Sequence, residues 1–367
     1  MITESQDANS CRNASILRWW GAKVRNGSIF LLIGRMLVQY KTLGNTDINV
    51  SEFALGCWPF AGGRVWGPQE DDVSIATVHA ALDKGITFFD TAEGYDDDSN
   101  SEEVLGRALA GRRNEAQIAT KLGKQYLKPE LVEDICNSSL RRMQTDYIDL
   151  YQIHWPNHDI AIEDSLAALI KLRDAGKIRS IGVCNFGVRD LSDAVNSADI
   201  VTDQLPYNML WRSIEHEILP KCIEHSVGLI CYSPLAQGLL TGRYATADDV
   251  PDGLSRSRVF SGDRPRATHG EPGCEIEAFA AIAKVIEISE ELGEHPAKVS
   301  LAWLRSRQGI TSLLVGARSP EELDLNIPAF EYTLPDGIAE RLSAATEPVK
   351  AKLGTSADMW NHDNRMR

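Results

Sequence analysis

Two side chains that can exchange protons lie close together in residues 88–106, which read FFDTAEGYDDDSNSEEVLG. This stretch begins as an apolar strand and continues as a polar turn and a helix. Asp90 stands where the strand ends, and Tyr95 follows five residues later. A buried carboxylate beside a phenol can support proton transfer. Such a site needs further partners, which other parts of the chain must supply.

The elements that position these residues alternate between short apolar strands and helical segments from Met36 onward. Repeated strand–helix units predict a parallel sheet. Eight units in one chain favour a closed (β/α)8 TIM barrel, an α/β fold, over an open doubly wound sheet. No G-x-G-x-x-G follows the first strand and no G-x-x-x-x-G-K-[ST] loop is present, so neither nucleotide-binding motif competes with this prediction.

The predicted strands cover residues 49–60, 86–91, 117–121, 147–155, 178–185, 200–207, 227–232 and 310–315. The predicted helices cover residues 72–83, 102–110, 129–143, 162–175, 189–198, 215–225, 275–292 and 320–327. Residues 245–273, between the seventh strand and the long helix at 275–292, are rich in Asp, Gly, Pro, Ser and Arg. A loop this long is either a functional lid or a plain surface insertion, and its place after a strand favours the lid.

Polar residues at the carboxyl ends of barrel strands are candidates for chemistry. The second strand ends in Asp90, and Tyr95 lies in the loop after it. The third strand ends in Lys121 and the fourth in His154. A lysine that ends an apolar strand is buried along its stem and needs a partner, which Asp90 on the neighbouring strand can provide. Alone, each of these residues has an ordinary structural explanation, but together they predict one site.

The chain resembles the aldo-keto reductase family from about Met36 to Asn326. The resemblance rests on FFDTAEGY with SEEVLGRAL, IATKLG, IDLYQIHW, IGVCNF, QLPYNML, CYSPLAQGLLTGRY and LVGARSPEELDLN, in the family's order. It implies a single-domain (β/α)8 barrel that reduces aldehydes or ketones to alcohols, reversibly, by direct hydride transfer from NADPH without a metal. The family's four catalytic residues fall on Asp90, Tyr95, Lys121 and His154.

The chemistry implied by the resemblance assigns each of these residues a role. Hydride addition leaves an alkoxide, and Tyr95 would protonate it. A tyrosine with an ordinary pKa of ~10 is a weak acid at neutral pH. Lys121 would therefore lower the pKa of Tyr95, and Asp90 would keep Lys121 charged and in place. His154 would hydrogen-bond the carbonyl oxygen and orient it.

The resemblance also implies a set of cofactor-binding residues. Asn185 and Gln204 match the positions that hold the nicotinamide carboxamide, and Tyr232 matches the aromatic ring that stacks on the nicotinamide. The pyrophosphate segment falls on Ser233, Leu235, Gly238 and Arg243, and the adenosine end on Gly316, Arg318, Glu322 and Asn326. Arg256 in the long loop is either a 2′-phosphate ligand or a solvated charge.

Three residues depart from the family's pattern. Cys184 stands where serine is common, which weakens one expected carboxamide contact. Glu322 stands where glutamine or arginine is usual, and Leu325 where glutamate is common. A carboxylate at position 322 would repel a 2′-phosphate and could accept from a ribose hydroxyl instead. The resemblance makes NADPH the expected cofactor, and the carboxylate at position 322 leaves NADH as the alternative.

Substrate identity is not encoded in any motif of the chain. Trp58 and Trp66 follow the first strand and Trp155 follows His154. These rings either line a pocket for a small carbonyl compound or sugar, or only pack loops together. Oligomeric state is likewise left open by the sequence.

The composition excludes several classes of protein. A formal net charge of −14 argues against nucleic acid or an anionic membrane surface as the general partner. Seven cysteines without a C-x-x-C pair indicate reduced thiols in a cytoplasmic protein. No apolar run approaches the ~18 residues that a membrane helix needs. We expect a disordered extension over residues 1–35, the barrel domain over 36–346 and a C-terminal tail over 347–367.

Two other functions fit parts of the sequence. The same fold could serve as an NADPH-binding redox-sensing or regulatory subunit with little turnover. A barrel glycosidase could use Asp90 and Glu93 as paired carboxylates, but that reading leaves Lys121 and the adenosine-end motif unexplained.

Overall fold

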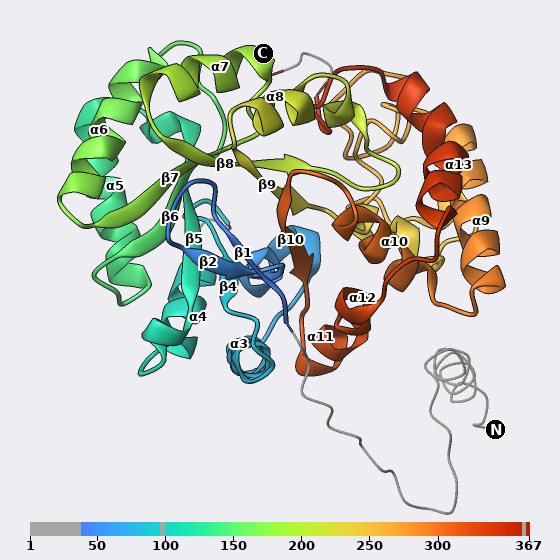
Figure 1. Ribbon diagram of the computed structural model, residues 1–367, viewed down its shortest axis with the longest axis horizontal. Helices are drawn as coiled ribbons and strands as arrows, with labels where there is room; N and C mark the ends of the chain where they lie inside the picture. The colour runs from blue at the N-terminus through green and yellow to red at the C-terminus, as the bar shows by residue number, and fades with distance from the viewer. Residues whose placement is uncertain (1–37, 96–99, 362–364) are drawn as a thin grey trace, which may run out of the picture.

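The computed structural model describes residues 38–95, 100–361 and 365–367, and Figure 1 shows a central barrel surrounded by helices. Eight strands form the closed barrel in the order β10-β3-β4-β5-β6-β7-β8-β9, and every neighbouring pair is parallel. The barrel strands are β3 (Phe53–Gly56), β4 (Phe88–Asp90), β5 (Gln117–Leu122), β6 (Ile148–Ile153), β7 (Ile178–Cys184), β8 (Ile200–Pro206), β9 (Gly228–Tyr232) and β10 (Ile310–Gly316). The predicted TIM barrel is confirmed.

Helices cover the outside of the barrel in Figure 1. Their bounds are α2 (Gly63–Trp66), α3 (Asp71–Asp83), α4 (Asn100–Ala108), α5 (Pro129–Arg142), α6 (Ile162–Asp174), α7 (Val188–Ser197), α8 (Ile218–Glu224), α9 (Glu275–Glu291), α10 (Pro296–Arg305), α11 (Pro320–Asn326), α12 (Pro328–Glu331) and α13 (Ile338–Leu353). Helix α5 illustrates how the sequence sets the two ends of a helix. Pro129 stands in its first turn, and Arg141 and Arg142 lie in its last turn beside the negative end of the helix dipole.

The prediction of a single strand over residues 49–60 is wrong, because this segment forms two short strands and the start of a 3₁₀ helix. Strand β2 (Asn49–Ser51) pairs antiparallel with β1 (Tyr40–Thr42), and only β3 joins the barrel. Leu43, Ile48 and Val50 from this hairpin are buried and pack with Phe88 inside the barrel. The hairpin therefore closes one end of the barrel with apolar side chains.

The last residues of the chain pack onto the barrel. A division at residue 346 would cut through α13, which runs to Leu353. Beyond it lies a segment that we call the C-terminal strap, residues 354–361 and 365–367. Ala357, Asp358 and Met359 in the strap are 3% exposed or less. The strap thus belongs to the folded core, while the extension expected over residues 1–35 lies outside the described residues.

The long loop, residues 245–273, has only the short helix η6 (Ala247–Asp249) and is held by side-chain contacts. Arg258 forms an ion pair with Glu271 at 2.8 Å. The same guanidinium donates to the Ser356 carbonyl oxygen at 3.2 Å and to the Asp358 carbonyl oxygen at 3.0 Å. Because one buried arginine joins both segments, the loop and the C-terminal strap form one connected layer.

All six cysteines in the described part of the chain are buried, and none forms a disulfide: Cys57, Cys136, Cys184, Cys222, Cys231 and Cys274. Burial raises the pKa of each thiol, to about 12 for Cys136 and Cys274. Within the described ranges, no cluster of His, Cys, Asp and Glu has the arrangement that a metal ion needs. The helices of that part are too short or too polar to cross a membrane.

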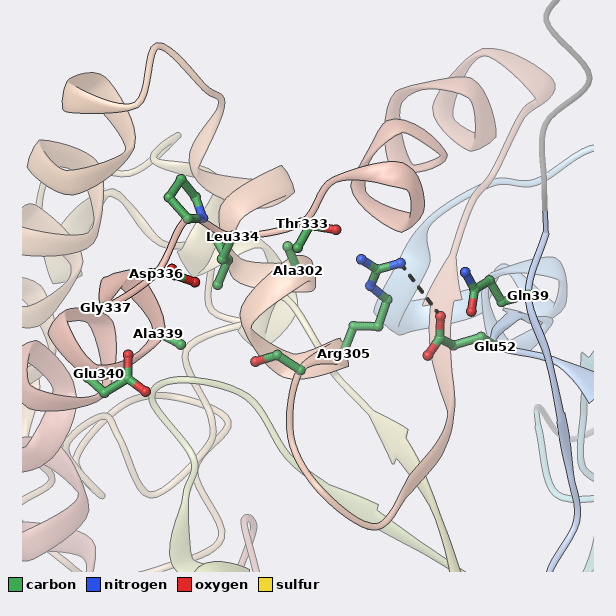
Figure 2. Close-up of a pocket in the computed structure, with 12 residues that line it drawn as sticks. Gln39, Glu52, Ala302, Arg305, Thr333, Leu334, Asp336, Gly337, Ala339 and Glu340 are labelled. Carbon is green, nitrogen blue, oxygen red and sulfur yellow. Dashed lines mark ion pairs between the residues drawn. The ribbon is translucent and has the colours of Figure 1, made fainter.

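A cavity of about 410 Å³ lies near the amino ends of the strands (Figure 2). Its wall includes Glu52, directly before β3, and Arg305, at the end of the helix before β10. Glu52 pairs with Lys41 at 2.7 Å and with Arg305 at 3.8 Å, so its charge is already balanced. The carboxyl ends of the strands, where barrel enzymes carry their chemistry, lie on the other side.

Candidate active site

Asp90, Tyr95 and Lys121 meet at the carboxyl ends of β4 and β5. Asp90 is the last residue of β4, and Lys121 lies on the neighbouring strand β5. The Lys121 ammonium donates to Asp90 Oδ1 at 2.5 Å and to the Tyr95 hydroxyl oxygen at 2.8 Å. Lys121 is 0% and Asp90 1% exposed, so this ion pair is shielded from water. Neighbouring strands thus bring together residues that lie far apart in the sequence.

The Lys121 ammonium has a full set of acceptors. Its third hydrogen bond goes to the Thr91 carbonyl oxygen at 2.7 Å. Burial by itself would lower the pKa of Lys121, but the charges of Asp90 and Tyr95 outweigh it, and the pKa is raised above its ordinary value. Lys121 is therefore charged at neutral pH, in agreement with the expected effect of Asp90.

Two glutamine amides hold the second oxygen of Asp90. Gln204 Nε2 donates to Asp90 Oδ2 at 2.7 Å, and Gln152 Nε2 approaches the same oxygen at 3.3 Å. Gln204 was expected to hold the nicotinamide carboxamide, and Gln152 was not predicted at all. Because side chains alternate along a strand, Gln152 shares a face with His154 two residues later, and that spacing in IDLYQIHW was the available signal.

The pKa of Tyr95 moves in the opposite direction to the one expected. Burial raises the pKa of this phenol, and although the charge of Lys121 opposes the rise, the net pKa lies above its ordinary value. The charge of Lys121 lowers the pKa as expected, but desolvation of the phenolate raises it by more. Tyr95 is therefore protonated at neutral pH and carries the proton that a general acid must supply.

His154 stands beside Tyr95 as a neutral imidazole. Its ring lies edge-on to the Tyr95 ring, with 6.0 Å between the centroids. Burial, and then the positive charge of Lys121, lower the pKa of His154 to about 3. A neutral imidazole has one N–H donor and one acceptor nitrogen, so His154 can donate to an oxygen without carrying charge.

The low pKa of His154 predicts a pH-dependent stability. An unfolded histidine has a pKa of ~6.5, so between pH 6.5 and pH 3 the unfolded chain binds a proton that the folded chain does not. The free energy of unfolding is therefore highest above pH 6.5 and decreases as the pH falls from 6.5 towards 3. Between pH 7.5 and 5 we expect wild type to lose on the order of 1–2 kcal/mol relative to His154→Gln. Urea unfolding at both pH values measures this, and parallel pH profiles would contradict it.

The residues expected at the nicotinamide end lie beside this group. The Tyr232 hydroxyl donates to Asn185 Oδ1 at 2.9 Å, and Asn185 Nδ2 donates to the His154 carbonyl oxygen at 3.0 Å. Asn185 has a φ of 61°, a conformation that asparagine tolerates better than most residues. Cys184, just before it, is buried. The carboxyl ends of β6, β7 and β9 are thus linked by side-chain contacts.

The expected pyrophosphate segment follows β9 as a sharply turning loop. Ser233 has a φ of 52° and Gly238 a φ of 94°, and Leu235 directly precedes η5 (Ala236–Thr241). Arg243 is exposed, and a side chain at Gly238 would stand 3.5 Å from it. The backbone therefore turns next to an exposed cation, which is an arrangement suited to an anionic group.

The adenosine-end residues lie at the end of β10 and in α11. The Arg318 N–H donates to Glu322 Oε2 at 2.8 Å, and Asn326 Nδ2 donates to the Glu322 carbonyl oxygen at 3.1 Å. The Arg318 guanidinium donates to Gln69 Oε1 at 3.0 Å. Gly316, at the end of β10, is exposed. These four residues form a group around the start of α11.

The three tryptophans divide into two groups. The Trp58 ring stacks on the Tyr95 ring with 5.7 Å between centroids, and Trp66 meets Trp58 edge-on at 5.5 Å. Trp155 instead lies under the Arg365 guanidinium of the C-terminal strap, 3.7 Å from Cζ to the ring centroid. Trp58 therefore faces the tyrosine and Trp66 packs on Trp58, whereas Trp155 is covered on one face by Arg365 of the strap.

Arg256 lies among the aromatic residues. Its Cζ is 5.9 Å from the Trp58 ring centroid and 4.7 Å from the Trp360 ring centroid. None of the contacts that the structure gives this side chain, within the described residues, involves the group around the start of α11. The cation expected at the 2′-phosphate thus stands next to the ring that stacks on Tyr95.

Known proteins are similar to this chain in sequence and in fold. The model of the aldo/keto reductase family matches residues 52–347. The aldo-keto reductase YhdN of Bacillus subtilis is 33% identical over 81% of this chain and 90% of its own length, and an NADH-specific methylglyoxal reductase of Escherichia coli is 30% identical over 84% and 98%.

Solved structures agree. A glycerol dehydrogenase from Gluconobacter oxydans matches with a TM-score of 0.72 and 31% identity, covering 84% of this chain and 95% of its own. An aldo-keto reductase from Klebsiella pneumoniae in complex with NADPH matches with a TM-score of 0.66 and 27% identity over the same shares. On the family match and these relatives, the chain belongs to the aldo/keto reductase family of oxidoreductases.

Proposed function

We propose that this protein reduces the carbonyl group of an aldehyde or ketone to an alcohol, reversibly, with NADPH as the hydride donor. The observation that supports this most strongly is the hydrogen-bonded series Asp90–Lys121–Tyr95 beside the neutral imidazole of His154. These groups supply a proton and a hydrogen-bond donor to one oxygen atom, which is what carbonyl reduction requires.

The residues present fit a nicotinamide dinucleotide. Asn185 and Gln204 offer amide groups at strand ends next to Tyr232, whose ring can cover one face of a flat ligand. Neither the Arg243 guanidinium, which lies over the Tyr244 ring, nor the Arg318 guanidinium, which donates to Gln69, forms an ion pair within the part of the chain that the structure describes, so both can meet phosphate groups. When bound, the cofactor supplies the hydride.

Tyr95 donates its hydroxyl proton to the oxygen that becomes negative as the carbonyl is reduced. Burial keeps that proton on the phenol beforehand, and Lys121 at 2.8 Å stabilises the phenolate afterwards. Asp90 holds Lys121 in place, and Gln204 and Gln152 hold Asp90. His154 donates its N–H to the same oxygen and orients the carbonyl. In the reverse direction, the Tyr95 phenolate removes the proton of an alcohol.

Glu322 bears on the choice between NADPH and NADH. The structural relative from Klebsiella holds NADPH, whereas the relative from Escherichia coli is described as NADH-specific. Glu322 is exposed and lies beside Arg318, where its charge would oppose a 2′-phosphate. Glu322→Gln keeps an oxygen for the Arg318 N–H and removes the charge. We expect it to lower the KM for NADPH about 3- to 10-fold relative to that for NADH. Equal changes in both KM values would contradict this role.

The relatives' names indicate small polar substrates: methylglyoxal for one and glycerol for another. We propose a small carbonyl compound or sugar for this protein, with Trp58 and Trp66 as the pocket wall nearest Tyr95. Arg365 covers one face of Trp155, so that face is closed to a substrate.

The deciding experiment is a panel of aldehydes, ketones and aldoses assayed with NADPH and NADH in parallel, following cofactor absorbance. We expect turnover with at least one small carbonyl compound. Cofactor binding without consumption across the whole panel would contradict the proposal and favour a redox-sensing or regulatory subunit.

A further inference from the structure

Arg256 differs from three other arginines of the long loop and the C-terminal strap, each of which has an acidic partner. Arg258 pairs with Glu271, Arg264 with Glu275 and Arg365 with Asp358. Arg256 has neither an ion pair nor a hydrogen bond within the described part of the chain, and its Nε is buried without a partner. An unbalanced cation with a buried N–H costs free energy that the fold recovers only when an acceptor binds.

The surroundings of Arg256 present its N–H groups and keep water off its faces. The guanidinium contacts two indole rings: its Cζ is 5.9 Å from the Trp58 ring centroid and 4.7 Å from the Trp360 ring centroid. Cation–π contacts hold the plane of a guanidinium but leave its edge N–H groups without acceptors. Burial, and then the nearby charge of Arg266, lower the pKa of Arg256.

The position of Arg256 relates it to the substrate side of the site. The Trp58 ring lies between Arg256 and Tyr95. Its centroid is 5.9 Å from Arg256 Cζ and 5.7 Å from the Tyr95 ring centroid, so Arg256 is one aromatic ring away from the proton donor. Trp360 also lies near enough to Tyr232, the ring expected to cover the nicotinamide, to lower the pKa of its hydroxyl. Arg256 therefore lies between Trp58, which stacks on the proton donor Tyr95, and Trp360, which lies near Tyr232.

We propose that Arg256 binds the carboxylate of an anionic substrate, so that the preferred carbonyl compound is a short oxo acid rather than a neutral aldehyde. This inference rests on the proposed function and names its substrate class. A guanidinium edge matches a carboxylate through two parallel hydrogen bonds, which fixes the carbonyl end toward Tyr95. The cofactor's 2′-phosphate is the other anion that Arg256 could take, and the experiment separates the two.

The test compares succinic semialdehyde with butanal, which has the same chain length and no charge. In Arg256→Gln we expect kcat/KM for succinic semialdehyde to fall about 10- to 100-fold, mainly through KM, while butanal changes less than about 3-fold. Arg341→Gln is the matched control, because Arg341 is an exposed arginine of α13 paired with Glu291 on the outer layer. It should leave both substrates unchanged.

Three outcomes would overturn the inference. These are an equal loss for both aldehydes, a wild type that prefers butanal, and a rise in the KM for NADPH without a rise in that for NADH. The last outcome would assign Arg256 to the 2′-phosphate.

Calorimetric titration with succinate provides a readout that needs no turnover. We expect binding to wild type and to Arg341→Gln, and at least 10-fold weaker binding to Arg256→Gln. If neither aldehyde is reduced, the proposed function fails, but the titration still decides the role of Arg256. Equal succinate affinity in all three proteins would mean that the two indole rings alone balance this cation.

Discussion

Tyr95→Phe should lower kcat for carbonyl reduction by about 10²- to 10⁴-fold, the usual contribution of a general acid. The substitution removes only the hydroxyl group, which contacts Lys121 at 2.8 Å, and keeps the ring that stacks on Trp58. Cofactor affinity should stay within about 3-fold, because no expected cofactor contact uses this hydroxyl. Steady-state kinetics and a fluorescence titration with NADPH measure the two quantities.

A control for this prediction is Tyr126→Phe, since Tyr126 lies in the short helix η3 (Lys124–Tyr126) after β5, close in sequence but outside the group around Lys121. It should keep near-normal turnover. Near-normal turnover in Tyr95→Phe would exclude Tyr95 as the acid, and a loss of cofactor binding would mean that the substitution disturbs the site more widely than its geometry suggests.

Asp90→Asn should destabilise the fold by about 3–5 kcal/mol, because it leaves the Lys121 ammonium buried without its counter-charge. The side chains of both residues are 2% exposed or less, so water cannot replace the lost carboxylate. The double substitution Asp90→Asn with Lys121→Met removes both charges and should recover most of that loss. Urea unfolding of the wild type, the single variant and the double variant gives the comparison.

Recovery in the double variant is the feature that separates a charge effect from a packing effect. If Asp90→Asn alone and the double variant are equally unstable, then shape and not charge explains the cost. Asp71→Asn serves as the control, because Asp71 pairs with Arg107 at 2.6 Å near the surface, where ion pairs contribute about 0–1 kcal/mol. Both catalytic-site variants should also lose turnover, whichever way stability behaves.

The fold was predictable because the barrel repeats one signal eight times. Each strand is a short apolar run, and the alternation with helices leaves few arrangements. The meeting of Asp90, Lys121 and His154 followed from the same regularity, because the carboxyl ends of parallel strands lie at one end of the barrel. The family resemblance gave the same three residues together with Tyr95, and the family match confirms that membership.

Features that depend on several distant contacts were not predictable from the sequence. The C-terminal strap is fixed by Arg258, by the Trp211 N–H to the Ala357 carbonyl oxygen, and by Arg365 on Asp358, and none of these pairs has a sequence pattern. The pKa of Tyr95 depends on how completely the surrounding chain excludes water, which residue types alone do not reveal. Helix α10 was missed because it follows α9 without an intervening strand.

The rate at which the buried cysteines react with a thiol reagent would measure local opening of the protein. A thiol reacts only when it is exposed and ionised, and Cys57, Cys184 and Cys274 meet neither condition in the folded state. Cys57 precedes Trp58 and Cys184 precedes Asn185, so their labelling times record excursions of the site, whereas Cys274 records the release of the long loop from α9. A thiol reagent with mass analysis would therefore rank the opening free energies of these regions in the unmodified protein, and would show which of them a bound ligand closes.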